Sequence, residues 1–146
     1  MFKHILISTD GSPVSNKAAK AGIALAHALG AKVTAYCAPE ELQMFAGEGY
    51  VPSQSMIDGF VQRVREVAQK RVDAIGKMAK AASVPFASMV TKAYTPYEGI
   101  INAARKRKCD VIFMASHGRR GFSKLIMGSV TQKVLSHSRI PVVVYR

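Results

Sequence analysis

The residues best suited to binding chemistry follow the most continuous apolar run of the chain. That run, Asp110–Ala115, leads into the loop Ser116–Ser123, which contains Gly118, Arg119, Arg120 and Gly121, and Gly128-Ser129 comes shortly afterwards. Glycine lets a ligand approach backbone N–H groups closely, and arginine supplies positive charge, so this composition is typical of an anion-binding loop. Because neither Gly-x4-Gly-Lys-Ser/Thr nor Gly-x-Gly-x-x-Gly after a strand occurs, the loop matches neither a Walker A nor a dinucleotide motif.

Other potentially reactive side chains lack partners in the sequence. His117 has the ionisation range of an acid or base, but no carboxylate stands next to it, so a role in positioning the loop is favoured. Cys37 and Cys109 have no adjacent histidine to activate them. Two cysteines and scattered histidines also make neither a disulfide framework nor a zinc site. We therefore predict no catalytic residue and no metal ligand.

The elements that must position these residues alternate regularly. Short apolar runs predict strands, and longer amphipathic segments predict helices. The strands are predicted at 4–8, 32–38, 85–91, 110–115 and 141–145, and the helices at 14–29, 55–82, 96–108 and 123–137. This order is typical of a parallel sheet with helices on both faces, a doubly wound α/β fold. No linker or repeat interrupts it, so we expect residues 1–146 to form a single domain.

Local signals predict where the helices begin and end. Ser12 is suited to cap the first helix, with Pro13 at its first position, and Gly30 is suited to end it. The sequence Thr95-Pro96-Tyr97-Glu98 predicts a capping box. Residues 40–54, rich in glycine and proline, predict a long loop.

The fold class indicates where a ligand would bind. In open α/β sheets, ligands bind beyond the carboxyl ends of the strands, where the strand order reverses. Ser8-Thr9-Asp10 closes the first predicted strand, Cys37 the second and Met114-Ala115 the fourth. These residues, together with the glycine-bearing loop, form the candidate site.

Several stretches resemble the universal stress protein family. Met114–Gly118, followed after nine residues by Gly128-Ser129-Val130, resembles the nucleotide signature Gly-x2-Gly-x9-Gly-Ser/Thr of that family. The opening Ile5–Ser12 and the closing Ile140–Val144 are similar to the family too, so the resemblance runs from end to end. In one departure, Ala115 stands where the signature has its first glycine.

The resemblance implies a Rossmann-like fold with strand order 3-2-1-4-5 and four helices, which binds an adenine nucleotide. It implies a stress-response regulatory protein that binds ATP or a related nucleotide, with or without Mg²⁺, and forms a homodimer through the edge strand Pro141–Arg146. By position, the residues that would line the cleft are Ser8, Thr9, Asp10, Cys37, Met114, Ala115, Gly118, Gly128, Ser129 and Val130.

The resemblance also implies a role for individual positions. Gly118 and Gly128-Ser129-Val130 would contact the phosphates, Asp10 would reach the ribose beside the Ala115 backbone, and backbone groups at Cys37 would bind the adenine. The residues themselves add Arg119, Arg120 and Lys124, whose charges lie beside the expected phosphates or point to solvent. No evident base positions a water, so we expect at most slow ATP hydrolysis.

Composition separates the remaining function classes. Of the 21 Lys and Arg residues, 17 fall within residues 62–146, and the net charge of +12 is typical of a protein with an anionic partner. A nucleic-acid partner for this basic half is one alternative, but neither a zinc finger nor an aromatic RNA-binding motif supports it. A nucleotide-free interaction module of the same fold is the other.

The apolar runs bear on location. None approaches the ~18–20 residues that a membrane span requires, so no membrane partner is expected. The opening apolar stretch is too short for a signal peptide. A cytoplasmic location is therefore expected.

Overall fold

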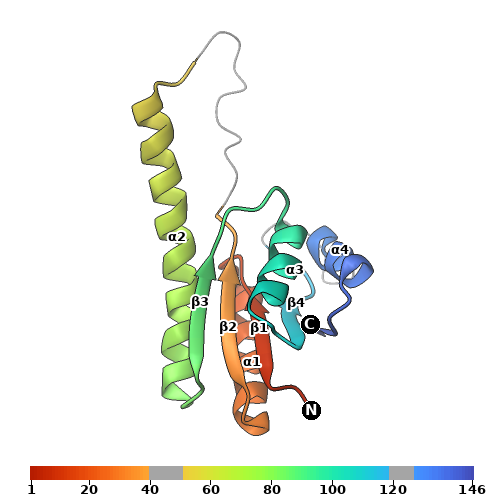
Figure 1. Ribbon diagram of the computed structural model, residues 1–146. Coiled ribbons are helices and arrows are strands. Elements are labelled where there is room, and N and C mark those ends of the chain that lie inside the picture. Colours follow the sequence, from red (N-terminus) through yellow and green to blue (C-terminus); the bar gives the residue numbers. More distant parts are fainter. Residues whose placement is uncertain (40–50, 119–126) are drawn as a thin grey trace.

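The computed structural model describes residues 1–39, 51–118 and 127–146, and within them it confirms the predicted α/β architecture (Figure 1). The predicted site residues Arg119 and Arg120 lie outside these ranges. Most of the predicted loop 40–54 also lies outside them. The strands are β1 (His4–Ser8), β2 (Lys32–Cys37), β3 (Phe86–Val90), β4 (Val111–Ala115) and β5 (Val142–Tyr145). The helices are α1 (Pro13–Leu29), α2 (Gln54–Ala81), α3 (Pro96–Lys106) and α4 (Ser129–His137).

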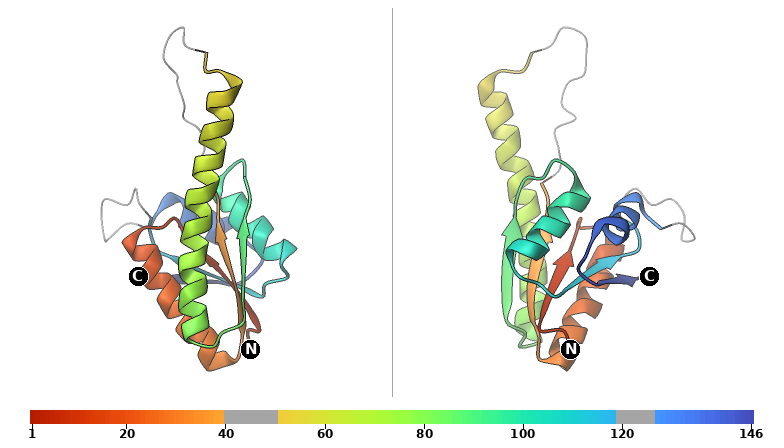
Figure 2. Two further views of the ribbon diagram at one scale, coloured as in Figure 1. Left: turned by 90° about the vertical axis from the view of Figure 1, so that its left-hand side faces the viewer. Right: turned by 45° about the vertical axis from the view of Figure 1, so that its right-hand side comes forward.

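All strand pairs in the sheet are parallel, and the order is β3-β2-β1-β4-β5, as the family resemblance implied. Ile5 on β1 pairs with Val33 on β2 and with Val111 on β4. The order therefore reverses between β1 and β4, whose carboxyl ends lie side by side. Helices α1 and α2 cover one face of the sheet, and α3 and α4 cover the other (Figures 1 and 2).

The core has two layers because each face of the sheet packs against its own pair of helices. Every residue of β1 and β4 is buried, as expected for central parallel strands. Ile5, Ile7 and Phe113 face α1 and α2, whereas Leu6 and Ile112 face α3 and α4. This burial on both faces explains why the two strands read as continuous apolar runs.

Both caps of α1 form as the sequence predicts, but the amino-terminal cap of α3 does not. The Ser12 hydroxyl accepts a hydrogen bond from the Ser15 N–H at 3.1 Å, and Gly30 ends the helix in the left-handed region with φ +63°. At α3, the Thr95 hydroxyl donates to the Glu98 carboxylate at 2.7 Å and caps no backbone N–H. The predicted capping box is therefore wrong in its hydrogen bonding, although α3 begins at the expected residue.

Helix α4 begins later than predicted. Residues 123–126 lie outside the described ranges, and Met127 and Gly128 are not helical. Gly128 has an extended backbone (φ −63°, ψ 147°), and its N–H donates to the Ser116 carbonyl at 2.8 Å. This bond holds Gly128 against the segment after β4, so the helix starts at Ser129.

Helix α2 extends well beyond the sheet (Figures 1 and 2). Its buried residues, Ala68, Val72, Ile75 and Ala79, all lie in the C-terminal half. In the described part of the chain, no helix is long and apolar enough to cross a membrane.

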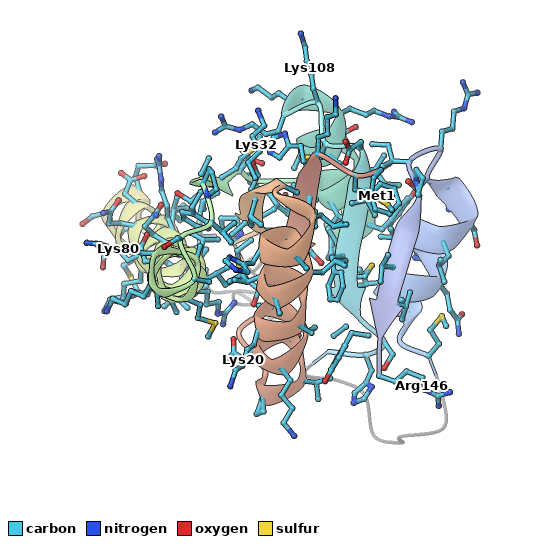
Figure 3. The ribbon with its side chains drawn as sticks, turned by 90° about the horizontal axis from the view of Figure 1, so that it is seen from below. Met1, Lys20, Lys32, Lys80, Lys108 and Arg146 are labelled. Atoms are coloured by element: carbon cyan, nitrogen blue, oxygen red, sulfur yellow. The ribbon has the colours of Figure 1, made fainter. Side chains whose placement is uncertain are left out.

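The basic side chains labelled in Figure 3, all from the described residues, do not gather on one surface. Seen from below, Lys20, Lys80, Lys108 and Arg146 lie on different sides of the molecule (Figure 3). Exposed Arg105 and Lys106 occupy the last turn of α3, where cations compensate the helix dipole. Among the described residues of the basic second half, Lys80, Lys108 and Arg146 therefore lie far apart on the domain.

A buried polar contact lies at the amino ends of the central strands. His4 is 8% exposed, and its Nε2 lies 2.8 Å from the hydroxyl oxygen of Thr34, which is fully buried. Burial, followed by the positive charge of Lys32, lowers the pKa of His4 below its ordinary value of 6.5, although Asp110 partly opposes this shift. The Asp110 carboxylate accepts the Lys3 and His4 N–H groups at 2.8 and 3.1 Å.

We expect the free energy of unfolding to fall as the pH is lowered below about 6.5. The unfolded chain then binds a proton at His4 more readily than the folded chain does, because the folded pKa is lower. A His4→Gln variant should lose this part of the pH dependence in urea denaturation followed from pH 8 to pH 5. An unchanged slope in the variant would contradict the assignment to His4.

Candidate functional site

The turn after β1 holds Asp10 at the carboxyl edge of the sheet. One Asp10 carboxylate oxygen, Oδ1, accepts the Ser12 N–H at 2.9 Å. The Thr9 hydroxyl accepts the Gly11 N–H at 3.0 Å and lies 3.0 Å from the Ser15 hydroxyl. Gly11 has φ +78°, a conformation that favours glycine. The Thr9 hydroxyl thus serves to shape the turn, and half-buried Asp10 is its acidic group.

Asp10 lies against the segment that follows β4. A Cβ atom added to Gly118 would collide with Oδ2 of Asp10, so only glycine permits this approach without a shift. The two residues are far apart in sequence but lie on adjacent loops because β1 and β4 are neighbours. The structure therefore brings together the acidic and glycine-bearing parts of the predicted site.

The start of α4 packs closely on the same segment. A Cβ on Gly128 would come within 3.1 Å of the His117 Cα, in addition to the Gly128 N–H bond to Ser116. Exposed Ser129 and half-buried Val130 open the helix. The first turn of a helix presents unsatisfied N–H groups and the positive end of the helix dipole. The predicted phosphate-binding residues among the described ones therefore lie together.

Five predicted residues are too buried to offer a side chain to a ligand. Ser8, Thr9, Cys37, Met114 and Ala115 are between 1% and 8% exposed. Cys37 and Ala115 belong to the core cluster facing α1 and α2. The Ala115 methyl group, which replaces the glycine of the family signature, thus packs in the core. These residues can contribute backbone groups only.

Thr131 and His117 support the site from within. The buried Thr131 hydroxyl donates to the Ala115 carbonyl at 3.0 Å, which ties α4 to the end of β4. His117 Nδ1 lies 3.0 Å from the Ser116 hydroxyl, in keeping with a positioning role. The sequence reasoning did not single out Thr131, because its partner is a backbone atom 16 residues away.

The sequence signals also did not indicate Arg71 on α2 as a residue near the site. Its side chain lies over Gly11, where an added Cβ would be 2.6 Å from Nε. The available signal was a charged residue among the apolar residues Ala68, Val72, Ile75 and Ala79, which share the buried side of α2.

Two other features bear on the chemistry. Within the described ranges, no group of three or more His, Cys, Asp or Glu residues could hold a metal ion. Burial raises the pKa of the Cys109 thiol to about 11, so this thiol is not activated as a nucleophile.

An open hollow of about 390 Å³ lies away from the predicted crevice, between β3 and the end of α3. Ser88–Thr91, Lys106 and Arg107 line it.

The family follows from comparison with known proteins. The family model described as "Universal stress protein family" matches residues 1–146, the whole chain. The chain belongs to the universal stress protein family. This membership confirms the resemblance seen in the signature around Gly118 and Gly128.

Curated and solved universal stress proteins agree with this membership. The chain is 30% identical over 146 residues to universal stress protein MJ0531 of Methanocaldococcus jannaschii, covering all of this chain and 83% of that protein. The solved structure of protein MJ0577, also from M. jannaschii, superposes with a TM-score of 0.83 at 25% identity, covering 99% of this chain and 95% of that one.

Two other solved universal stress proteins contain a nucleotide. One is in complex with cAMP (TM-score 0.63, 20% identity, 99% and 97% coverage). The other, from Archaeoglobus fulgidus, is in complex with dAMP (TM-score 0.63, 13% identity, 100% and 98% coverage). At these identities both show that the fold is shared.

We expect Thr131→Val to lower the free energy of unfolding by about 1 kcal/mol, since a buried carbonyl loses its partner while the side-chain shape is kept. Ser136→Ala is the matched control in the same helix, because the Ser136 hydroxyl donates to the Gln132 carbonyl at 2.8 Å on the exposed face. Urea denaturation of both variants measures the difference. Equal losses would show that the Thr131 bond is not special to the site.

Proposed function

We propose that this universal stress protein binds an adenine nucleotide, ATP or a related one, in the crevice between the carboxyl ends of β1 and β4. The observation that carries the proposal is the contact of the Asp10 carboxylate with Gly118, since it joins the acidic turn and the glycine-bearing segment in one place. This crevice is the point of strand-order reversal, where ligands of doubly wound sheets bind. The related structures with cAMP and dAMP support the ligand class.

Each part of the nucleotide would find matching chemistry. Carboxylate oxygens accept hydrogen bonds from hydroxyls, so Asp10 suits the ribose. The N–H groups that open α4 at Ser129-Val130 suit phosphate oxygens, as does the close approach permitted at Gly128. Backbone groups at Cys37 would bind the adenine. Arg119 and Arg120 stay predicted phosphate contacts outside the described residues.

The departure at Ala115 does not oppose this proposal. Its methyl group packs in the core cluster, and its carbonyl, although bonded to Thr131, retains a second lone pair. A backbone contact beside the ribose therefore remains available. The nucleotide would act as a regulatory ligand in a stress response, and Mg²⁺, slow hydrolysis and a cytoplasmic location stay predictions.

Of the two alternatives, nucleic-acid binding gains no support from the labelled cations, which lie on separate sides (Figure 3). A polyanion requires a basic stripe on one surface. The nucleotide-free interaction module shares the same fold, and only a binding measurement separates it from the proposal.

We expect the purified protein to release adenine nucleotide on denaturation, or to bind added ATP in calorimetry. Asp10→Asn should lower the ATP affinity at least about tenfold, because the charged acceptor is lost while its Oδ1 can still accept the Ser12 N–H. Asp58→Asn, a change of the same kind on exposed α2, should leave the affinity unchanged.

The absence of co-purified nucleotide together with no heat at millimolar ATP would contradict the proposal and favour the nucleotide-free module. Unchanged ATP affinity in Asp10→Asn would show that the nucleotide binds elsewhere.

We also propose that β5 pairs with its counterpart in a second copy of the chain. β5 is an edge strand, and Val142, Val143 and Val144 are all only half-buried. Toward β4, the carbonyls of Pro141 and Tyr145 accept the N–H groups of Ile112 and Ser116 at 2.9 and 2.8 Å.

Because alternate residues of a parallel ladder bond the same neighbour, Val142 and Val144 direct their N–H and C=O groups outward. An apolar edge strand with unpaired groups is suited to join a two-fold partner.

Val144→Pro should convert the dimer to a monomer in size-exclusion chromatography with light scattering, since it removes one outward N–H and leaves the β4–β5 ladder intact. Val144→Thr, which keeps both the N–H and the β-branched shape, should remain dimeric. A dimer that persists in Val144→Pro would place the interface elsewhere, and a monomeric wild-type protein would contradict it altogether.

A further inference from the structure

Arg71 interrupts the face of α2 that packs on the sheet. It lies three residues after Ala68 and four before Ile75, both of which are fully buried. Residues at these spacings share one side of a helix. Arg71 is therefore a half-buried charged residue on a side of α2 whose buried positions are all apolar.

The side chain reaches the carboxyl edge of the sheet. Arg71 precedes the end of α2 at Ala81 by ten residues, which is roughly 15 Å of helix. The adjacent β3 has five residues, a length of roughly 17 Å, so Arg71 lies level with the carboxyl ends of the strands.

There the side chain lies over Gly11, next to Asp10. An added Cβ on Gly11 would be 2.6 Å from Nε, 2.9 Å from Cδ and 3.1 Å from Cγ of Arg71. The absence of a side chain at Gly11 thus leaves room for Arg71 as well as permitting the φ of +78°. The guanidinium is held beside the turn that carries Asp10.

The position of Arg71 also indicates which end of a nucleotide it would meet. Arg71 approaches from the face of α1 and α2, whereas α4, the proposed phosphate end, lies on the opposite face of the sheet (Figures 1 and 2). Cys37, whose backbone is proposed to bind the base, ends β2, which together with β3 packs against α2. Asp10, proposed for the ribose, lies between the two ends.

We propose that Arg71 contacts the nucleoside end of the bound nucleotide, with its planar guanidinium stacked on the base or donating to the base ring nitrogens. This inference rests on the proposed nucleotide-binding function. A guanidinium plane stacks on aromatic rings and offers donors in a fixed geometry, which the compact ammonium of lysine does not reproduce. Arg71 is thus a determinant of base binding that lies outside the family signature.

The test compares adenosine with ATP in calorimetric titrations of the full chain, using Arg71→Ala, Arg71→Lys and the control Lys70→Ala. Lys70 is the exposed neighbour on the same helix, so its removal matches the charge change. Arg71→Ala and Arg71→Lys should weaken adenosine and ATP by the same factor, about tenfold, as expected for a lost base-stacking contact. Lys70→Ala should change neither affinity, and thermal unfolding verifies that each variant is folded.

The outcomes separate this inference from the function on which it rests. If the wild-type protein binds neither adenosine nor ATP, the proposed function is contradicted. If the wild-type protein binds and Arg71→Ala binds equally well, only the role of Arg71 is contradicted. If Arg71→Ala weakens ATP alone and Arg71→Lys restores it, the side chain acts as a charge on the phosphates, and the base contact is overturned.

Discussion

The pairing of β1 with a parallel neighbour on each side is the constraint on which the site depends. β1 is bonded to β2 and β4 along its length and is buried on both faces. The chain that leaves it can therefore only continue at the carboxyl edge, where it meets the chain leaving β4. The chain after β1 enters a helix on one face of the sheet, and the chain after β4 enters a helix on the other. A crevice between the ends of the two strands is therefore a consequence of the strand order.

Within that crevice, two glycines determine how closely other groups approach. Gly118 admits the Asp10 carboxylate, and Gly11 admits the Arg71 side chain. A side chain at either position would require a neighbour to shift, so the identity of these residues is explained by contacts with residues far away in sequence. The turn after β1 thereby carries an acidic group, Asp10, and lies beside a cation, Arg71, that α2 supplies.

The net charge of +12 suggests one anionic partner, but the positions of the basic residues have a more general explanation. Arg105 and Lys106 lie at the end of α3, where the helix dipole favours them. Lys20, Lys80 and Lys108 lie on separate sides of the domain. Arg71 differs from these described cations in its position, because its side chain lies over Gly11 in the turn that carries Asp10. Its charge is the same as theirs.

The sequence by itself determined the element order, the sheet type and the caps of α1, because apolar periodicity and the Ser12-Pro13 and Gly30 signals are local. The family signature also located the candidate residues around Gly118 and Gly128. Only the tertiary structure decided that α4 starts at Ser129, that the Ala115 methyl packs in the core, that Thr131 bonds the Ala115 carbonyl, and that Arg71 lies over Gly11. Those facts depend on contacts between residues distant in the chain, such as Ser116 with Gly128 and Gly11 with Arg71, which no local pattern encodes.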